Sequence, residues 1–365
     1  MGNKLALTVG GVHKVGKKAY LTVSGVHRKV KKAYLTVGGV HRKCFGGELA
    51  YHGTATPLSV GRCELAATSI GNYALFGGGS VLSTVDAYDK SLTRTTATNL
   101  STGRSCLAAT TIGDYAVFGG GSKDSKTQFT TVDAYNKSLT HTTATELSLK
   151  RTRLAATTIG DYALFAGGRR YFTSSIILSE STVDAYNKSL TRTTATEMSW
   201  GLCHLTATTV GDYALFGSGL TSSDASSDVV NAYDKSLTRT IPTALSSTRY
   251  GSAAATIGDY ALFGGGYKSA RVDTVDTYDK SLTRVTATGL SMAKANHAAT
   301  TIGDYAVFGG GSLSATVDTY DKSLTRTTVT ELSEARHNLA ATTVGDYALF
   351  GGGYDDTATV DVYTV

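Results

Sequence analysis

The chain has 365 residues and a formal net charge of +6, with 41 glycines, two prolines and one tryptophan. This composition argues against a helical protein and favours short strands joined by tight turns. No stretch of 18 apolar residues exists and the N-terminus lacks the apolar segment of a signal peptide, so we expect synthesis in the cytoplasm and no membrane insertion. The four cysteines (Cys44, Cys63, Cys106 and Cys203) have neither metal-type spacing nor the density of a disulfide scaffold, and we expect free thiols.

Residues 1–47 are a basic segment of short repeats. They contain ten Lys or Arg and no Asp or Glu; since the whole chain carries +6, residues 48–365 carry about −4. The phrase LTVGGVH or LTVSGVH occupies residues 7–13, 21–27 and 35–41, a strict 14-residue period. Such runs predict β-strands or hairpins too small to bury a core alone, so they need a partner or copies of themselves.

This segment resembles the short repeats in minor structural proteins of phages and prophages of Gram-positive bacteria. The resemblance implies attachment to virion or tail structural proteins, in several copies or as a homo-oligomer. The candidate anchoring residues are the basic clusters Lys17, Lys18, Arg28, Lys29, Lys31, Lys32, Arg42 and Lys43. Nucleic acid is a weaker alternative, because few aromatic residues are interleaved with these charges. Metal binding between chains by His13, His27 and His41 is the other alternative, although single histidines 14 residues apart are more often incidental.

Residues 51–59 form the next predicted strand, Tyr-His-Gly-Thr-Ala-Thr-Pro-Leu-Ser. The stretch aligns with Leu92–Ser101 (LTRTTATNLS), which ends the repeat unit that follows it. We therefore expect a single strand of the repeat type that stands before the first complete unit.

Residues 61–365 repeat one phrase seven times. Its tyrosine landmark falls at residues 73, 115, 162, 213, 260, 305 and 347, with intervals of 42, 47, 51, 47, 45 and 42 residues. This is the period of a propeller blade. Each unit contains four strand-like runs, here called A, B, C and D. In the second unit they are residues 107–112, 115–119, 131–136 and 139–145, with Gly-Asp between A and B and Asn-Lys-Ser-Leu between C and D.

The seventh unit stops after strand C at Val365, and Tyr51–Ser59 supplies the strand D that it lacks. A strand from the N-terminus that completes the last blade would remove the exposed edge of the ring. The sequence therefore predicts an all-β, seven-bladed propeller of four-stranded antiparallel blades over residues 48–365, closed by an N-terminal strand and preceded by the basic β-repeat segment of residues 1–47.

The units resemble the kelch family. The matching features are the paired glycines after strand B, the Tyr-Asp of strand C and the Arg that follows Leu-Ser. The tryptophan of strand D in the kelch pattern is replaced here by Thr or Arg, as at Thr93 and Arg94, so no characterised subfamily is indicated. The resemblance implies a propeller and the use of arginines near the axis to bind a ligand.

The two ends of the predicted propeller differ. The A–B and C–D turns are nearly constant, whereas the B–C and D–A loops vary in length and composition; we call these the constant end and the variable end. A scaffold with one differentiated end suggests a binding surface there. Five arginines and one lysine recur in the D–A loops, with Leu202 in the fourth unit: Arg62, Arg104, Arg151, Arg249, Lys294 and Arg336.

These cations would suit an acidic or carboxylate-bearing partner. The alternative is that they pair with acidic groups of neighbouring blades. Aromatic residues of the same end would add stacking surfaces for a glycan or a protein. They are Trp200, Tyr250, Tyr171, Phe172, Tyr267 and Tyr354.

Catalytic motifs are absent from the sequence, which contains no HExxH, GxSxG or P-loop, and the Gly-Gly-Gly runs end strands instead of opening helices. The Asp of Val-Asp-Ala-Tyr recurs in six units, so we assign it a structural role. His204, His297 and His337 lie in D–A loops of different units, and we expect neither a metal nor another cofactor there.

Our leading hypothesis is a non-enzymatic, virion-associated adhesin. The basic segment would attach it to a particle, and the variable end would bind a host-surface glycan or protein. A cytoplasmic kelch-type scaffold for protein interactions and a carbohydrate-active enzyme are the alternatives.

Overall fold

The computed structural model describes residues 48–172, 176–312 and 314–365, together with the backbone of six short strands between residues 6 and 45. The chain divides into two compact units, Met1–Ala50 with Val365, and Tyr51–Thr364. The described residues include no helix that is long and apolar enough to cross a membrane.

The first unit contains three antiparallel hairpins, each with one copy of the 14-residue repeat. The strands are β1 (Ala6–Thr8), β2 (Gly11–His13), β3 (Ala19–Val23), β4 (Val26–Val30), β5 (Ala33–Val37) and β6 (Val40–Phe45). In each of the last two hairpins the Leu-Thr-Val strand ends where its partner begins, so that Val23 faces Val26 and Val37 faces Val40. The predicted β-repeat is therefore confirmed at the level of its backbone.

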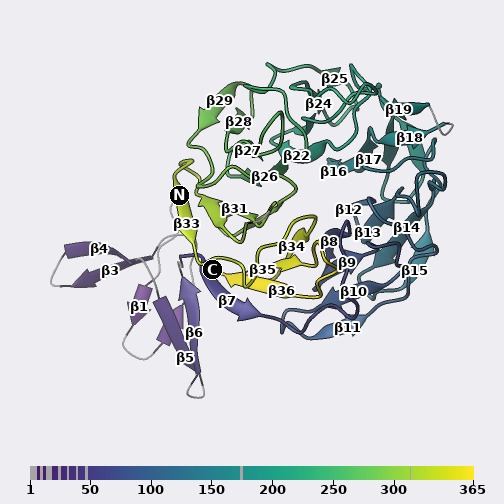
Figure 1. Ribbon diagram of the computed structural model, residues 1–365. Coiled ribbons are helices and arrows are strands. Elements are labelled where there is room, and N and C mark those ends of the chain that lie inside the picture. Colours follow the sequence, from purple (N-terminus) through teal and green to yellow (C-terminus); the bar gives the residue numbers. More distant parts are fainter. Residues whose placement is uncertain are drawn as a thin grey trace. The chain divides into compact units, whose positions relative to one another are not determined.

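The second unit is a ring of seven four-stranded antiparallel sheets, the blades, in the order A, B, C and D (Figure 1). Blade 1 consists of β8 (Ala66–Ile70), β9 (Tyr73–Gly77), β10 (Val85–Tyr88) and β11 (Arg94–Thr96). Blade 2 consists of β12 (Ala108–Ile112), β13 (Tyr115–Gly119), β14 (Val132–Asn136) and β15 (His141–Thr143). Blade 3 consists of β16 (Ala155–Ile159), β17 (Tyr162–Ala166), β20 (Val183–Tyr186) and β21 (Arg192–Thr194). Blade 4 consists of β22 (Thr206–Val210), β23 (Tyr213–Gly217), β24 (Val230–Tyr233) and β25 (Arg239–Thr240).

Blade 5 consists of β26 (Ala253–Ile257), β27 (Tyr260–Gly264), β28 (Val275–Asp279) and β29 (Arg284–Ala287). Blade 6 consists of β30 (Ala298–Ile302), β31 (Tyr305–Gly309), β32 (Val317–Tyr320) and β33 (Arg326–Val329). Blade 7 is β34 (Ala340–Val344), β35 (Tyr347–Gly351), β36 (Val360–Thr364) and β7 (Ala50–Thr54). One further hairpin, β18 (Arg169–Tyr171) and β19 (Ile177–Ser179), is inserted in the B–C loop of blade 3.

Strand β7 closes the ring as the sequence predicts. It pairs with β36, so that strands from the two ends of the chain share one sheet. The Tyr51 hydroxyl donates a hydrogen bond to Asp361 Oδ1 at 2.7 Å, and the Ala55 amide donates to the Val360 carbonyl at 2.9 Å. Blade 7 thus has no exposed edge at β36.

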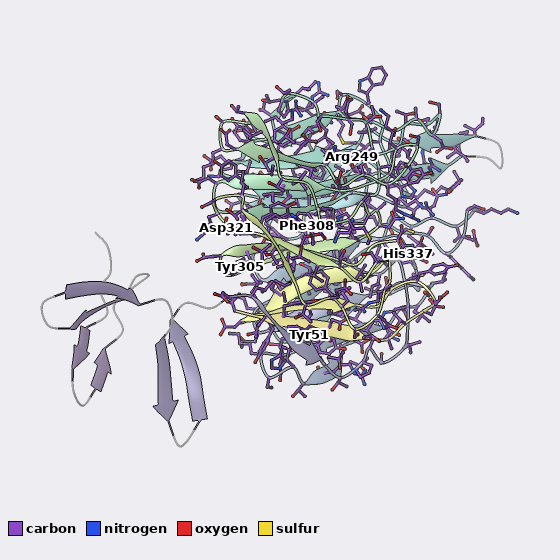
Figure 2. The ribbon with its side chains drawn as sticks, turned by 60° about the vertical axis from the view of Figure 1, so that its left-hand side comes forward. Tyr51, Arg249, Tyr305, Phe308, Asp321 and His337 are labelled. Carbon is purple, nitrogen blue, oxygen red and sulfur yellow. The ribbon has the colours of Figure 1, made fainter. Side chains whose placement is uncertain are left out.

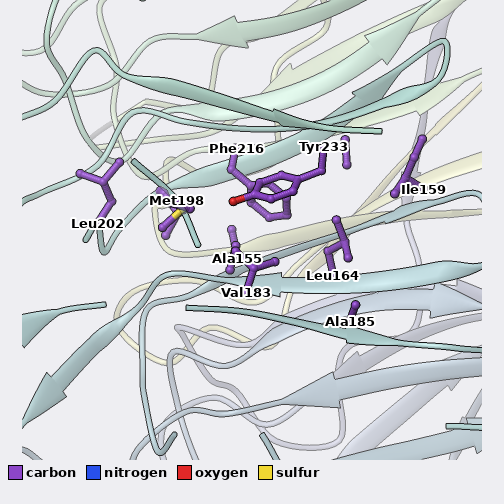
Figure 3. Packing of buried hydrophobic residues seen from close by; sticks show 12 residues of the cluster. Ala155, Ile159, Leu164, Val183, Ala185, Met198, Leu202, Phe216 and Tyr233 are labelled. Carbon is purple, nitrogen blue, oxygen red and sulfur yellow. The ribbon is translucent and has the colours of Figure 1, made fainter. Parts of the chain in front are cut away.

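The blades pack face to face through strand B. The Phe of each strand B is fully buried and meets the Tyr of its own strand C edge to face, as Phe216 meets Tyr233 at 5.9 Å (Figure 3). Its ring lies against the last residue of strand B in the preceding blade. A Cβ atom on Gly77 would lie 2.8 Å from the ring of Phe118, and one on Gly351 would lie 2.8 Å from that of Phe76. Glycine occupies this position in six blades, where the neighbouring ring leaves little room for a side chain, and blade 3 has the small Ala166 there, packed in one cluster with Phe216.

Candidate functional site

The two ends of the propeller carry different chemistry. The constant end repeats one turn, in which a C–D lysine pairs with the A–B aspartate of its own blade, as Lys137 pairs with Asp114 at 2.5 Å. In Figure 2 the constant-end residues Tyr305 and Asp321 lie on the side of the propeller opposite His337, which belongs to a D–A loop. The loops that differ from blade to blade therefore lie at the variable end.

The six D–A cations that the sequence suggested as partner contacts are buried. Arg62, Arg104, Arg151, Arg249, Lys294 and Arg336 are each at most 3% exposed, and Figure 2 places Arg249 within the body of the propeller. Each pairs with the strand C aspartate of its blade: Asp86, Asp133, Asp184, Asp276, Asp318 and Asp361, at 2.6–3.3 Å. The structure therefore contains the alternative that the sequence left open, in which the cations pair with acidic groups inside the propeller. The assignment of these cations to a binding surface is therefore wrong.

Each ion pair belongs to a larger network that holds a blade together. In blade 2, Arg104 also donates to the Phe118 carbonyl, while Asp133 accepts from the Ser101 amide and contacts His141 at 2.7 Å. Burial raises the pKa of Asp133, but the charge of Arg104 and these hydrogen bonds outweigh it and hold the pKa below its ordinary value. The strand C aspartate thus has the structural role that its recurrence predicts.

The exposed apolar side chains gather at the variable end. Of the ten large apolar side chains exposed among the described residues, eight lie in its loops; the other two are Val285, in the outer strand β29, and Ile241, directly after the outer strand β25. The eight are Val60, Val81, Phe172, Ile176, Trp200, Tyr267, Met292 and Tyr354. Trp200 and Phe172 are the most exposed, at 65% and 63%. Tyr171 and Tyr250, the other two aromatic candidates from the sequence, are half-buried.

The β18–β19 hairpin carries part of this exposed apolar surface, and ion pairs and hydrogen bonds fix its position. The Arg170 guanidinium lies 5.5 Å from the centre of the Phe172 ring and pairs with Glu180 at 2.6 Å. Arg169 pairs with Asp224 in the B–C loop of blade 4, and the Tyr171 amide donates to Gln128 of blade 2. Both neighbouring blades therefore hold the insertion in place.

A ring of backbone hydrogen bonds encircles the axis at the variable end. One D–A residue of each blade donates its amide to the carbonyl of the equivalent residue in the preceding blade, and the Glu64 amide closes the circle on Asn338. All seven have positive φ, between 52° and 62°. They are Glu64, Cys106, Arg153, His204, Gly251, Asn296 and Asn338.

We call these seven residues the axial ring. The sequence pattern pointed to the recurring cation two residues earlier, and none of the seven was predicted as a binding residue. The signal was present: the axial-ring position lies two residues after the cation of six units and directly before a leucine in five units, yet its own residue differs in nearly every unit.

The axial ring and the residues that follow it line a cavity of about 310 Å³. Arg153 lies 3.9 Å from the Glu64 carboxylate and donates a hydrogen bond to Nε2 of His204. Burial, together with the charges of Arg153 and Arg169, lowers the pKa of His204 to about 3. Burial and the nearby Glu64 raise the pKa of the Cys106 thiol to about 12. At neutral pH these four residues therefore give the cavity one paired positive and negative charge, a neutral imidazole and an unreactive thiol.

The remaining candidates from the sequence are placed as follows. Within the described part of the chain, no three His, Cys, Asp or Glu residues lie close enough together to hold a metal ion. Of the basic anchoring residues, Arg28 and Lys29 lie in strand β4, and Arg42 and Lys43 lie in β6. Lys17, Lys18, Lys31 and Lys32 lie outside the described residues.

Comparison with known proteins identifies the architecture. No family model and no curated protein sequence matches the chain. The solved structure of YjhT is similar, with a TM-score of 0.57 and 13% sequence identity over 84% of this chain and 95% of that one. At this identity the similarity shows the fold alone: residues 51–364 form a seven-bladed β-propeller.

Proposed function

We propose that the propeller is a binding module whose variable end docks on a partner. The supporting observation is the concentration of exposed apolar side chains in the loops of this one end. Trp, Tyr, Phe and Met are enriched at the centres of protein interfaces, where burying them contributes most of the binding free energy. Aromatic faces also pack against sugar rings, so a glycan suits the same surface.

The whole chain suits a particle-bound adhesin of kelch-like repeats. The basic N-terminal hairpins, with their resemblance to phage and prophage repeats, would dock on virion or tail proteins in several copies. The variable end would bind a host-surface glycan or protein. In the propeller, β7 begins beside the end of β36, at the constant end, because these strands are antiparallel neighbours. The chain therefore enters the propeller at the end opposite the variable loops, which suits an adhesin attached through its N-terminal segment.

The proposal is tested by binding of fluorescent full-length protein to a panel of intact Gram-positive bacterial cells, measured by flow cytometry. Trp200→Ala and Tyr354→Ala should each weaken binding. Loss of a central aromatic anchor costs about 2 kcal/mol or more, which is roughly a 30-fold weaker affinity. Val285→Ala removes an exposed apolar side chain outside the variable end, and Lys188→Ala removes a charge at the constant end; both should bind as the parent does.

Equal losses in the control variants would show that the variable end is not the binding surface. Retention of one soluble intracellular protein through Trp200, with no binding to cells, would assign that surface to a protein-interaction scaffold and overturn the adhesin.

A further inference from the structure

The axial ring combines side chains of different chemistry on one backbone conformation. Its seven positions carry an acid, a base, two amides, a thiol, an imidazole and a glycine. All seven residues line the axial cavity of about 310 Å³, and this volume lies at the lower end of the range for small-molecule sites, roughly 300–1,000 Å³. The backbone amides of the ring are already bonded to one another. Recognition of a ligand therefore falls to the side chains.

Two opposite charges of the ring lie close together without bonding to each other. Nη2 of Arg153 is 3.9 Å from Oε1 of Glu64, which is beyond hydrogen-bond distance, and the two side chains are 33% and 34% exposed. Nη1 of Arg153 donates to Nε2 of His204, whose imidazole stays neutral because burial and two nearby arginines lower its pKa to about 3. His204 thus positions the guanidinium, and both charges remain accessible to a ligand.

Two amide side chains continue the ring from blades 6 and 7. Asn296 and Asn338 line the cavity and are partly exposed, and neither side-chain amide has a hydrogen-bond partner among the described residues. Asn338 stands between Asn296 and Glu64 in the ring, because its backbone bonds to both. A Cβ atom on Gly251 would lie 2.5 Å from Oδ1 of Asn296, so glycine leaves room for that amide. Unused amide groups therefore follow the carboxylate around the ring.

The pair of opposite charges discriminates between classes of ligand. An anion attracted by Arg153 would be repelled by Glu64, and a cation attracted by Glu64 would be repelled by Arg153. A neutral ligand would displace water from both charges without offering either an opposite charge. A zwitterion gives each of them an opposite partner, and an ammonium group has three donors to share between a carboxylate and an amide oxygen. The site therefore favours a small zwitterion.

We propose that the axial ring binds a free α-amino acid. Its carboxylate would pair with Arg153, and its ammonium group would be held by Glu64 and Asn338. The inference goes beyond the docking of a large partner, since it assigns a separate small-molecule site at the centre of the same end. The arginines that the sequence suggested for an acidic partner are neutralised inside the blades, whereas Arg153 keeps a third of its side chain exposed.

The first experiment compares three charge forms of one ligand by isothermal titration calorimetry with the full-length protein. The common free amino acids are titrated singly, and the tightest binder is compared with its N-acetyl derivative, which lacks the positive charge, and its amide derivative, which lacks the negative one. Each blocked form should bind roughly tenfold more weakly or worse, because it leaves one charge of the site without a partner. Equal binding of the N-acetyl form, or no free amino acid with a Kd below about 1 mM, would overturn the inference.

Two substitutions separate ligand contact from packing. Glu64→Asn and Arg153→Asn each install the residue that blades 6 and 7 carry at this position, and asparagine tolerates the left-handed conformation of the ring, so the fold should be kept. Each should weaken the free amino acid by roughly tenfold. Glu64→Asn should also remove the preference over the N-acetyl form, and Arg153→Asn the preference over the amide form. Equal weakening of all three forms in both variants would indicate a structural role and overturn the inference.

Asp114→Asn is the matched control. It removes a carboxylate that pairs with Lys137 at the constant end, and it copies Asn72 of the equivalent turn in blade 1, so amino-acid affinity should not change. A loss equal to that of Glu64→Asn would overturn the inference. If cells are bound through Trp200 while no amino acid binds, the inference fails and the proposed function stands. If amino acids bind and Trp200→Ala binds cells as the parent does, the inference stands and the proposed function fails.

Discussion

At the scale of single residues, the decisive feature is the buried ion pair of each blade. Six blades pair a D–A cation with a strand C aspartate, and blade 4 replaces both partners at once, with Leu202 and Asn231. A buried charge is costly unless it is paired, so losing one partner alone is worse than losing both. Blade 4 is the solution that avoids an unpaired charge: Leu202 is fully buried, and Asn231 still accepts from the Ser199 amide at 2.9 Å.

This pairing predicts that the effects on stability of substitutions at Arg104 and Asp133 in blade 2 are strongly coupled. Arg104→Leu alone leaves the Asp133 carboxylate buried beside an apolar side chain, and should destabilise the protein by about 3–5 kcal/mol. The double variant Arg104→Leu/Asp133→Asn copies blade 4 and should recover most of that loss. Urea unfolding followed by circular dichroism measures both. Additive losses in the double variant would contradict the pairing argument.

At the scale of elements, the C–D turn contains stabilising hydrogen bonds together with one residue in an unfavourable backbone conformation. In blade 4, Oδ1 of Asp234 accepts hydrogen bonds from the amides of Ser236 and Thr238, which fixes the turn. The turn then requires Leu237 to adopt φ of 63°, in the left-handed region that favours glycine. Leucine is retained there because its side chain packs against the apolar cluster between blades 3 and 4. Packing between blades therefore outweighs a local conformational cost.

The balance can be measured at Leu237. Leu237→Ala loses the packing and keeps the backbone strain, whereas Leu237→Gly loses the packing and relieves the strain. Since the left-handed conformation costs a non-glycine residue roughly 1–2 kcal/mol, the glycine variant should be the more stable of the two by about 1 kcal/mol, with both below the parent in melting temperature. An alanine variant as stable as the parent would show that the leucine side chain contributes nothing there.

At the scale of the whole molecule, the ring depends on one N-terminal strand. Besides its pairing with β36, the segment after β7 accepts a hydrogen bond at the Thr56 carbonyl from the buried Tyr88 hydroxyl of blade 1. Removing the segment would expose the edge of β36 and leave two buried polar groups, Asp361 and Tyr88, each without one of its hydrogen bonds.

Truncation separates this role from that of the basic segment. Residues 48–365 should melt at the temperature of the full chain, because they keep β7 and all seven blades. Residues 60–365 should melt at a lower temperature, over a broader range, and aggregate through the open edge of β36. Differential scanning calorimetry and light scattering compare the two. Equal melting of both truncations would refute closure by β7.

The sequence by itself determined the number of blades, the four strands of each, the closing strand and the contrast between the two ends. All of these follow from a repeat whose period and strand pattern are local properties of the chain. Tertiary structure alone decided which loop side chains face solvent. Arg62 and Trp200 both lie in D–A loops, yet one is fully buried against Asp86 and the other is 65% exposed.

No local pattern distinguishes these two residues, because the partner that buries Arg62 lies 24 residues away in another strand. The axial ring depends still more on closure, since its members are 42 to 51 residues apart along the chain and meet only when the seventh blade contacts the first. Periodicity specifies which strand a residue belongs to, but the close approach of seven blades around one axis decides which side chains remain free to bind.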